Sequence, residues 1–451
     1  MVLSSLLLLS IAAPLCTLAQ DVSQYPVFAN LRSSRPVTAQ SSPTRNKTCL
    51  VNSHNDLVSD DSKYILEAIE ECNNGGHVIF LEKSSYVIGT PLNLTYLSAV
   101  DLDIQGSVSF TNDTDYWQKN SFRLVFQNAT SYFLLGGKDV NVYGGGTIHG
   151  NGQTWWNAFA AKKSTNRPIL FATVGLEGGS ISDLSLTASP FWHNIIANSS
   201  DVVYTDMRLY SVSNNQNFEK NTDGWDTYRS TGIIIQNSTI TNGDDCVSFK
   251  PNSTNIIVRN LSCNGTHGIS VGSLGQYPER VDYVENILVT NVNMYNSSEG
   301  ARIKVWPDSY SEKSAALSGG GGPGLVRNVT YDGMWLDNVD YGLTITQCYG
   351  QDNETLCFEH PSKLNIQDVT FRNIRGRTNR VFAPIVAHLV CSSNETCSNI
   401  VAENVDIRTI RYVFLKGFSY VCVATPVCFT ISPLALLEEH VLTLMRVVVQ
   451  T

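Results

Sequence analysis

An internal repeat constrains the fold of this chain more than any other feature of its sequence. A unit of the form Asn-apolar-x-apolar-x-Asn is clearest at residues 286–291 and 399–404, which read NILVTN and NIVAEN. Related units end at Asp183, Asp206, Asn237, Asn260, Gly333 and Asp368. From the first mark at 183 to the last at 404, the spacings are 23, 31, 23, 31, 42, 35 and 36 residues. Three short strands and their turns fit in about 23 residues, the period of one coil of a parallel β-helix, so the longer spacings indicate loop insertions.

The predicted fold class is all-β, a single-domain right-handed parallel β-helix. No helix-forming segment separates the repeat units, which argues against a sheet built from alternating strands and helices. Asn at a fixed place suits a ladder of side-chain amides, whereas a β-sandwich, the rival fold, would not repeat an Asn register at this period. One short helix is expected where Asp60, Asp61 and Ser62 precede a run with apolar residues on one face, ending before Asn74. This helix would cap one open end of the solenoid.

The composition excludes several classes of protein. Hydrophobic residues make up 42% of the 451 residues, which is ample for a large core and unlike a disordered chain. Charged residues make up only 16%, the net charge is −9, and no run of basic residues occurs. Nucleic acid is therefore a poor candidate partner.

Three features indicate secretion. Residues 2–18 are almost wholly apolar and precede a small-residue cleavage site, so residues 1–19 are predicted to be a secretory signal. Its removal discards Cys16 and leaves ten of the 11 Cys residues, an even number that suits disulfides. Asn-x-Ser/Thr acceptors recur, including Asn46, Asn93, Asn128, Asn237, Asn260, Asn264, Asn328 and Asn394. The mature protein is predicted to be extracellular and glycosylated.

The repeat also brings reactive side chains together. With Asn237 and Asn260 as equivalent marks, Asp244 and Asp245 follow the first mark by seven and eight residues. His267 follows the second mark by seven residues. These groups should lie at the same turn of adjacent coils, separated by about one strand spacing of ~4.8 Å.

Neighbouring coils add further charged groups. Arg302 and Lys304 are two residues apart, so both should point to one face of a strand. Residues 221–226, with two more Asp residues, form an insertion one coil earlier. Glycosidic cleavage needs one carboxylic acid that protonates the leaving oxygen and another carboxylate that activates water. Crowded carboxylates repel, so one of them should hold its proton near neutral or mildly acidic pH. The alternative, that these Asp residues only form turns, leaves the matching positions of His267 and the two cations unexplained.

At these residues the chain resembles glycoside hydrolase family 28, the polygalacturonases. The four short motifs of the family are matched in order at residues 221–224 (NTDG), 243–245 (GDD), 265–268 (GTHG) and 302–304 (RIK). The third motif departs mildly, because the family usually has Gly-Gly-His-Gly there. The resemblance covers residues 45–407.

The resemblance implies an inverting hydrolysis of α-1,4-galacturonosyl links in pectate. Asp244 would be the general acid, and Asp223 and Asp245 would act on the attacking water. His267 would tune or hold the proton of Asp244. The residues expected to bind substrate are Asn221, Arg302, Lys304 and Tyr349. No metal or cofactor is implied, the expected partner is polygalacturonate or pectin, and the protein is expected to be a monomer without a membrane partner.

Within the family, the resemblance favours an exo-acting enzyme that releases galacturonate. Trp225, residues 273–277 and residues 304–306 are most similar to fungal exopolygalacturonases, and the insertion at 307–322 would close one end of the groove. Endopolygalacturonase, xylogalacturonan hydrolase and rhamnogalacturonan hydrolase are the enzyme alternatives, and the intact Arg-x-Lys motif argues against the last. A pectate lyase would need a calcium-binding carboxylate group and an Arg or Lys base. An inactive wall-binding β-helix protein would have lost a motif carboxylate, and none is lost.

Two other patterns suggest different chemistry. Residues 268–272 match Gly-x-Ser-x-Gly, but that motif needs a strand-to-helix turn, so Ser270 is interpreted as a residue of a β-coil. Paired Cys residues can bind zinc, yet a secreted chain favours disulfides. The local pairings that we expect are Cys49–Cys72, Cys246–Cys263, Cys348–Cys357 and Cys391–Cys397.

The resemblance stops near residue 407. From there the Asn, Gly and Thr pattern vanishes, and residues 417–437 carry no charge. This stretch is long enough to span a membrane, but its two prolines and modest hydrophobicity weaken that interpretation. The predicted domains are a signal at 1–19, a pectinase β-helix at 20–407 and an atypical tail at 408–451. We interpret the tail as the product of an incorrect gene model, with a genuine anchor or a novel cap as alternatives, and the pairing of Cys422 with Cys428 is left open.

Overall fold

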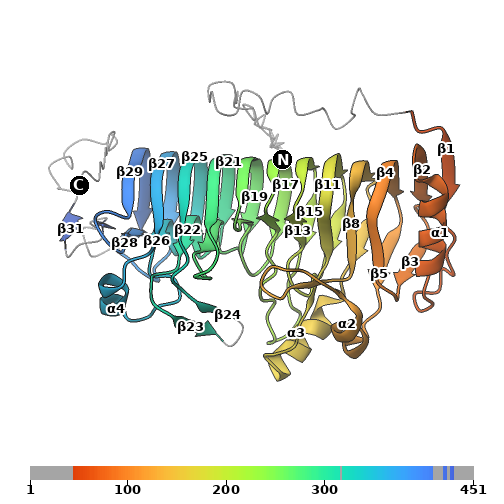
Figure 1. The fold of residues 1–451 in the computed structure, drawn as a ribbon, viewed down its shortest axis with the longest axis horizontal. Coiled ribbons are helices and arrows are strands. Elements are labelled where there is room, and N and C mark those ends of the chain that lie inside the picture. Colours follow the sequence, from red (N-terminus) through yellow and green to blue (C-terminus); the bar gives the residue numbers. More distant parts are fainter. Residues whose placement is uncertain (1–43, 315–316, 410–419, 424–426, 431–451) are drawn as a thin grey trace, which may run out of the picture.

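The computed structural model describes residues 44–314, 317–409, 420–423 and 427–430, which form a long parallel β-helix (Figure 1). The predicted signal and most of the C-terminal tail lie outside the described residues. Among the described residues, no helix combines the length and the apolar character needed to cross a membrane.

Each coil contributes strands to three parallel series that follow the axis of the solenoid (Figure 1). The first series, called face A, consists of β13 (Asn194–Ala197), β16 (Trp225–Tyr228), β18 (Val247–Phe249), β20 (Ile269–Leu274), β22 (Glu299–Val305), β26 (Tyr341–Thr346), β28 (Ile385–Val390) and β30 (Tyr420–Val423). Three strands begin in face A and continue into the second series: β4 (Leu92–Ile104), β8 (Phe133–Tyr143) and β11 (Phe171–Ser182).

The other two series share long strands that bend midway. These are β17 (Thr231–Thr241), β19 (Ser253–Asn264), β21 (Asp282–Tyr295), β25 (Gly324–Val339), β27 (Leu364–Thr378) and β29 (Cys397–Thr409). Nearer the N-terminus the second series has β1 (Lys47–Leu50), β2 (Gly76–Phe80) and β14 (Ser200–Thr205). The third has β3 (Ser85–Ile88), β5 (Ser107–Phe110), β9 (Thr147–His149), β12 (Ser185–Thr187) and β15 (Arg208–Tyr210).

A few strands lie in the loops or at the C-terminal end. They are β6 (Phe122–Arg123), β7 (Thr130–Ser131), β10 (Pro168–Ile169), β23 (Ser311–Ser314), β24 (Leu317–Gly319) and β31 (Val427–Thr430). β23 and β24 form an antiparallel hairpin inside the predicted insertion at 307–322. β30 continues face A beyond the boundary predicted at residue 407, and its antiparallel pairing with β31 places Cys422 opposite Cys428.

The interior is filled by aliphatic side chains stacked in register. One stack runs through Ile233, Ile256, Ile287, Val329, Val369 and Ile400, all of which are buried. Since each coil covers the apolar face of the next, the coils share one continuous core.

The repeated Asn residues occupy left-handed turns and form amide ladders. Asn237, Asn260 and Asn291 have φ angles of 51°, 56° and 53°, a region that Asn and Gly adopt far more readily than other residues. The amide of Asn260 donates to Asn237 Oδ1 at 2.9 Å, and that of Asn291 donates to Asn260 Oδ1 at 2.7 Å. The predicted ladder is confirmed, and Gly333, with φ 74°, keeps the turn in the next coil without an amide.

One predicted mark of the repeat is wrong. The sequence places Asp368 after Gly333, but the register pairs Asp332 with Arg372, so Asn373 occupies the equivalent turn. Asp368 belongs to a second ladder at the other end of the unit, where the amide of Asn399 donates to it at 2.7 Å. The motif carries two Asn residues because the chain bends at both ends of the short strand.

The predicted N-terminal helix is confirmed as α1 (Ser62–Cys72), which buries Ile65, Ala68 and Ile69 at the end of the solenoid (Figure 1). Three further helices lie in insertions and were not predicted: α2 (Thr114–Asn120), α3 (Gly152–Ala161) and α4 (Glu354–Glu359). All four predicted disulfides form, namely Cys49–Cys72, Cys246–Cys263, Cys348–Cys357 and Cys391–Cys397.

The ladder leads to a prediction about stability. Asn291→Ala should lower the free energy of unfolding by about 2 kcal/mol, because it combines a left-handed Ala with the loss of a hydrogen bond. Asn291→Gly loses the same hydrogen bond but tolerates the turn, as Gly333 does one coil later, so it should cost about 1 kcal/mol less. Urea unfolding of both variants measures the difference. A larger loss for the Gly variant would contradict the conformational part of this explanation.

Candidate active site

The predicted catalytic residues occupy successive coils of face A. Asp223 lies just before β16, Asp244 and Asp245 before β18, His267 before β20, and Arg302 and Lys304 within β22. Backbone hydrogen bonds link these turns: His267 N donates to Asp244 O at 2.8 Å, and Gly224 N donates to Asp245 O at 2.9 Å. The predicted convergence of these residues is confirmed.

Asp244 and His267 face each other. His267 Nδ1 lies 3.3 Å from Asp244 Oδ1, and their side chains are 44% and 19% exposed. Burial alone would raise the pKa of Asp244, but His267 outweighs burial and lowers this pKa below its usual range. Burial alone would lower the pKa of His267, but Asp244 raises it. In the free protein the proton of this pair therefore resides on His267.

Asp245 is held by two side chains from later coils. The ammonium of Lys304 lies 2.6 Å from Asp245 Oδ2, and Ser270 Oγ donates to Asp245 Oδ1 at 2.7 Å. Burial opposes ionisation, yet Lys304 lowers the pKa of Asp245, so this carboxylate stays charged. Ser270 is fully buried within β20 and donates to a carboxylate rather than to a His. The interpretation of Ser270 as a coil residue is consistent with this geometry.

Asp223 belongs to a second buried charge group, whose cation, Lys250, the sequence analysis missed. Lys250 Nζ lies 3.3 Å from Asp226 Oδ1 and 3.7 Å from Asp223 Oδ2, and all three side chains are at most 7% exposed. Burial, followed by the charges of Asp226 and Asp244, raises the pKa of Asp223 well above its usual range. Burial also raises the pKa of Asp226 to about 7, although Lys250 opposes the rise. Asp223 is thus the carboxylate that matches the expectation that one member of a crowded group keeps its proton.

Strand alternation is a signal from which Lys250 could have been found. Asp226 lies in β16, and its register partner in β18 is Ser248, two residues before Lys250. Residues two apart on a strand point to the same face, so Lys250 had to lie beside Asp226 on face A.

Two of the predicted substrate-binding residues lie beside Lys304 and Asp245. Arg302 Nε is 4.0 Å from Glu299 Oε1 and makes no hydrogen bond, so its guanidinium has capacity to bind an anion. The ring centroid of Tyr349 lies 5.7 Å from Lys304 Nζ, and the ring itself packs edge-on against Trp306. That Arg302 and Tyr349 bind substrate stays a prediction.

Asn221 is oriented by a buried Arg that the sequence analysis did not identify. Arg167 donates to Asn221 Oδ1 at 2.8 Å, and its charge stacks on the ring of Phe159. With its oxygen occupied, Asn221 turns its amide toward Asp244 and donates to Oδ2 at 3.3 Å. Asn221 therefore contacts the candidate acid directly.

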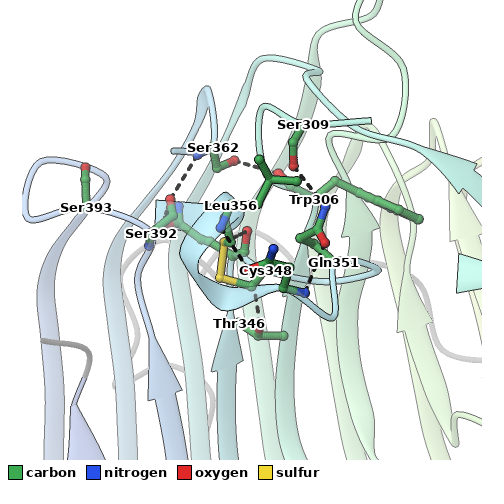
Figure 2. The surroundings of a disulfide bond; sticks show 12 residues. Trp306, Ser309, Thr346, Cys348, Gln351, Leu356, Ser362, Ser392 and Ser393 are labelled. Atoms are coloured by element: carbon green, nitrogen blue, oxygen red, sulfur yellow. Dashed lines mark hydrogen bonds between the residues drawn. A yellow bond between two sulfur atoms is a disulfide. The ribbon is translucent and has the colours of Figure 1, made fainter. Parts of the chain in front are cut away.

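A disulfide-bonded loop holds Tyr349 in place. Cys348 is paired with Cys357, and the backbone N–H of Tyr349 donates to Val305 O at 3.0 Å. Figure 2 shows Gln351 of this loop reaching Ser309 in the insertion that follows β22. The loop and the insertion thus contact each other beside the C-terminal end of β22.

The carboxylates are also close enough to be considered for a cation. Asp223, Asp244 and Asp245 can each bring one oxygen within 4.8 Å of the others. Each of them, however, already faces an ammonium or imidazole group. These groups offset the negative charge that would attract a metal cation. That no metal or cofactor is needed stays a prediction.

Comparison with known proteins shows what this chain is similar to. Residues 83–416 match the family described as Glycosyl hydrolases family 28. An exopolygalacturonase of Cochliobolus carbonum is 58% identical over 375 residues, 83% of this chain and 84% of that protein. Exopolygalacturonase X of Aspergillus niger is 57% identical over 370 residues, 82% of this chain and 84% of that protein. The crystal structure of endo-xylogalacturonan hydrolase from Aspergillus tubingensis superposes with a TM-score of 0.71 and 32% identity, covering 80% of this chain and 93% of the other.

Proposed function

Because the chain belongs to glycosyl hydrolases family 28, we propose that it is an exopolygalacturonase, which hydrolyses α-1,4-galacturonosyl links of pectate and releases galacturonate. The single observation that carries this proposal is the buried group of carboxylates and cations on face A. The Asp residues supply acid and base chemistry, while Arg302 and Lys304 supply positive charge that would recognise the carboxylates of the polymer.

Asp244 acts as the general acid in the proposed mechanism. His267 carries a proton beside Asp244 in the free protein and would supply it when substrate binds. Asp245, kept ionised by Lys304, and Asp223 would orient and deprotonate the attacking water. In the free protein Asp223 holds a proton, so this mechanism requires Asp223 to release that proton to solvent before it can accept one from the attacking water.

The exo mode follows from a contact that crosses face A. Residues 124–129 belong to a loop that precedes the face A part of its coil, whereas Gln276 follows β20, so a contact between them must pass over the face. Gln127 donates to Gln276 Oε1 at 3.2 Å, and Gln276 donates to Ser318 O of the hairpin at 3.0 Å. Phe126 stacks on Tyr228 with 4.6 Å between ring centroids. This loop therefore covers part of face A, and it would close one end of a substrate groove there, which favours removal of terminal residues.

Early products of polygalacturonate hydrolysis test this function. We expect galacturonate alone, separated by chromatography, with no ladder of oligomers. Phe126→Ala combined with Gln127→Ala should open the closed end and yield dimers and trimers as well. Early oligomers from the unaltered enzyme would instead indicate an endo-acting enzyme, such as the structurally similar endo-xylogalacturonan hydrolase. No release of reducing ends would favour an inactive wall-binding protein.

The stereochemical course needs its own measurement. The resemblance to the family implies inversion, yet oxygens of the three Asp residues come within 4.8 Å of one another. In inverting enzymes the acid and base usually stand roughly 6.5–9.5 Å apart, which leaves room for a water. NMR of the first-formed product should show the β-anomer from an α-link, and an α-anomer would contradict the proposed water-activating roles.

Location and assembly complete the proposal. The apolar segment at 1–19 and the four disulfides support secretion, because such bonds persist in oxidising surroundings. We propose that the secreted protein acts as a monomer on pectin.

A further inference from the structure

Face A continues for two coils beyond the cations that would bind substrate. β26 and β28 follow β22 in parallel register, with Thr344 beside Arg302 and His388 beside Thr344. Since register partners in a parallel sheet point to the same side, these three side chains line one track on face A.

An aromatic stack borders this track. The ring centroid of Tyr341, the first residue of β26, lies 4.3 Å from that of Phe382, and the two planes differ by 8°. The ring of His388 lies 5.7 Å from Tyr341 at 23°. Phe382 is 42% exposed in a loop before β28. Burial lowers the pKa of His388 although Glu354 opposes this, which favours the neutral form of the third ring.

The position of the aromatic stack matches the path of a bound chain. His267 precedes β20, and Tyr341 begins β26, two strands later, which corresponds to roughly 10 Å along the axis. The loop that carries Gln127 covers face A nearer the N-terminus, so a polymer held at Asp244 would extend over β22, β26 and β28. Two sugar residues beyond the cleaved bond would span this distance.

Resting on the proposed function, we propose that Tyr341, Phe382 and His388 form a binding subsite for the second galacturonate residue of the leaving chain. These three rings would bind the sugar without contributing a charge. The apolar face of a sugar ring packs on an aromatic face, while Arg302 and Lys304 engage the carboxylate one residue closer to the cleaved bond. The subsite makes the enzyme prefer chains of three or more residues over the dimer.

Rates on substrates of different length test this subsite. Digalacturonate ends one residue beyond the cleaved bond and cannot reach the stack, whereas trigalacturonate can. For Phe382→Ala and Tyr341→Ala we expect kcat/KM on trigalacturonate to fall about three- to tenfold through KM, with kcat and all rates on digalacturonate unchanged. Trp335→Ala is the matched control, because it removes an aromatic side chain that is 51% exposed on β25. It should leave kcat/KM unchanged on both substrates.

The outcomes separate this subsite from the proposed function. Unaltered enzyme should hydrolyse both substrates and prefer the trimer, whereas inactivity on both would overturn the exopolygalacturonase proposal itself. Equal losses on dimer and trimer in the Phe382 and Tyr341 variants, or no loss on either, would overturn only the subsite. A comparable loss of the trimer preference in Trp335→Ala would also overturn it.

Discussion

Asp244→Asn is expected to lower kcat on polygalacturonate by about 10²–10⁴, the usual cost of losing general acid catalysis. The amide cannot donate the proton that the leaving oxygen needs, although it fills the same space beside His267 and Asn221. KM should change little, because the cations that would bind substrate, Arg302 and Lys304, are untouched.

A second substrate shows whether the lost step is protonation. A galacturonide with an acidic phenol as leaving group departs without a proton, so Asp244→Asn should hydrolyse it at nearly the normal rate. Asp245→Asn is the matched control, and it should fail on both substrates because its expected role is with the water. Asp223 holds a proton in the free protein, so it is the alternative candidate for the general acid, and Asp223→Asn tests that alternative. If Asp223→Asn, and not Asp244→Asn, were rescued by the better leaving group, the acid would be Asp223.

Lys250→Met should lower the free energy of unfolding by about 3–5 kcal/mol at neutral pH, the usual cost of removing one partner of a buried ion pair. The substitution leaves Asp226, which is fully buried, without its counter-charge at 3.3 Å. Neither oxygen of Asp226 has a hydrogen-bond partner to compensate.

The pH dependence of this loss has a definite sign. Burial already raises the pKa of Asp226 to about 7, and the loss of Lys250 raises it further, so the folded variant binds a proton more tightly than the unfolded chain. Stability then falls as pH rises from about 4, where the unfolded carboxyl ionises, through the folded pKa. Urea unfolding between pH 4.5 and 8 should show a deficit that grows with pH.

A double variant separates charge from packing. Lys250→Met with Asp226→Asn removes both charges and should recover most of the lost stability. Lys63→Met on α1 removes an exposed partner of Glu67 and should cost less than about 1 kcal/mol. If the double variant were as unstable as Lys250→Met alone, packing rather than the unpaired Asp226 would be the cause.

Much of the fold and of the site could be predicted because a solenoid converts sequence spacing into spatial position. A seven-residue offset from two equivalent Asn marks was enough to place Asp244 beside His267, and the helix α1 had an ordinary amphipathic pattern. The wrong mark at Asp368 arose because Asn and Asp fill left-handed turns at both ends of the same unit, so the pattern alone did not distinguish them.

Other parts could not be predicted because they depend on where insertions fold. α2, α3 and the loop that carries Phe126 lie outside the periodic coils, so spacing says nothing about what they touch. Arg167 reaches Asn221 from such an insertion, at a sequence separation of 54 residues. The same reason hid the Gln127–Gln276 contact, which joins residues 149 positions apart.

The order of the coils also determines how the molecule should respond to heat. Each coil pairs along its strands with the coils on either side of it, so opening should start at the two ends and advance inward. The strands that carry the site, β16 to β22, are central in Figure 1, with several coils on each side. We therefore expect amide protection to rise from the termini toward these strands, and hydrolysis to persist after the terminal coils have begun to fray. The reactive centre thus sits where a linear stack unravels last.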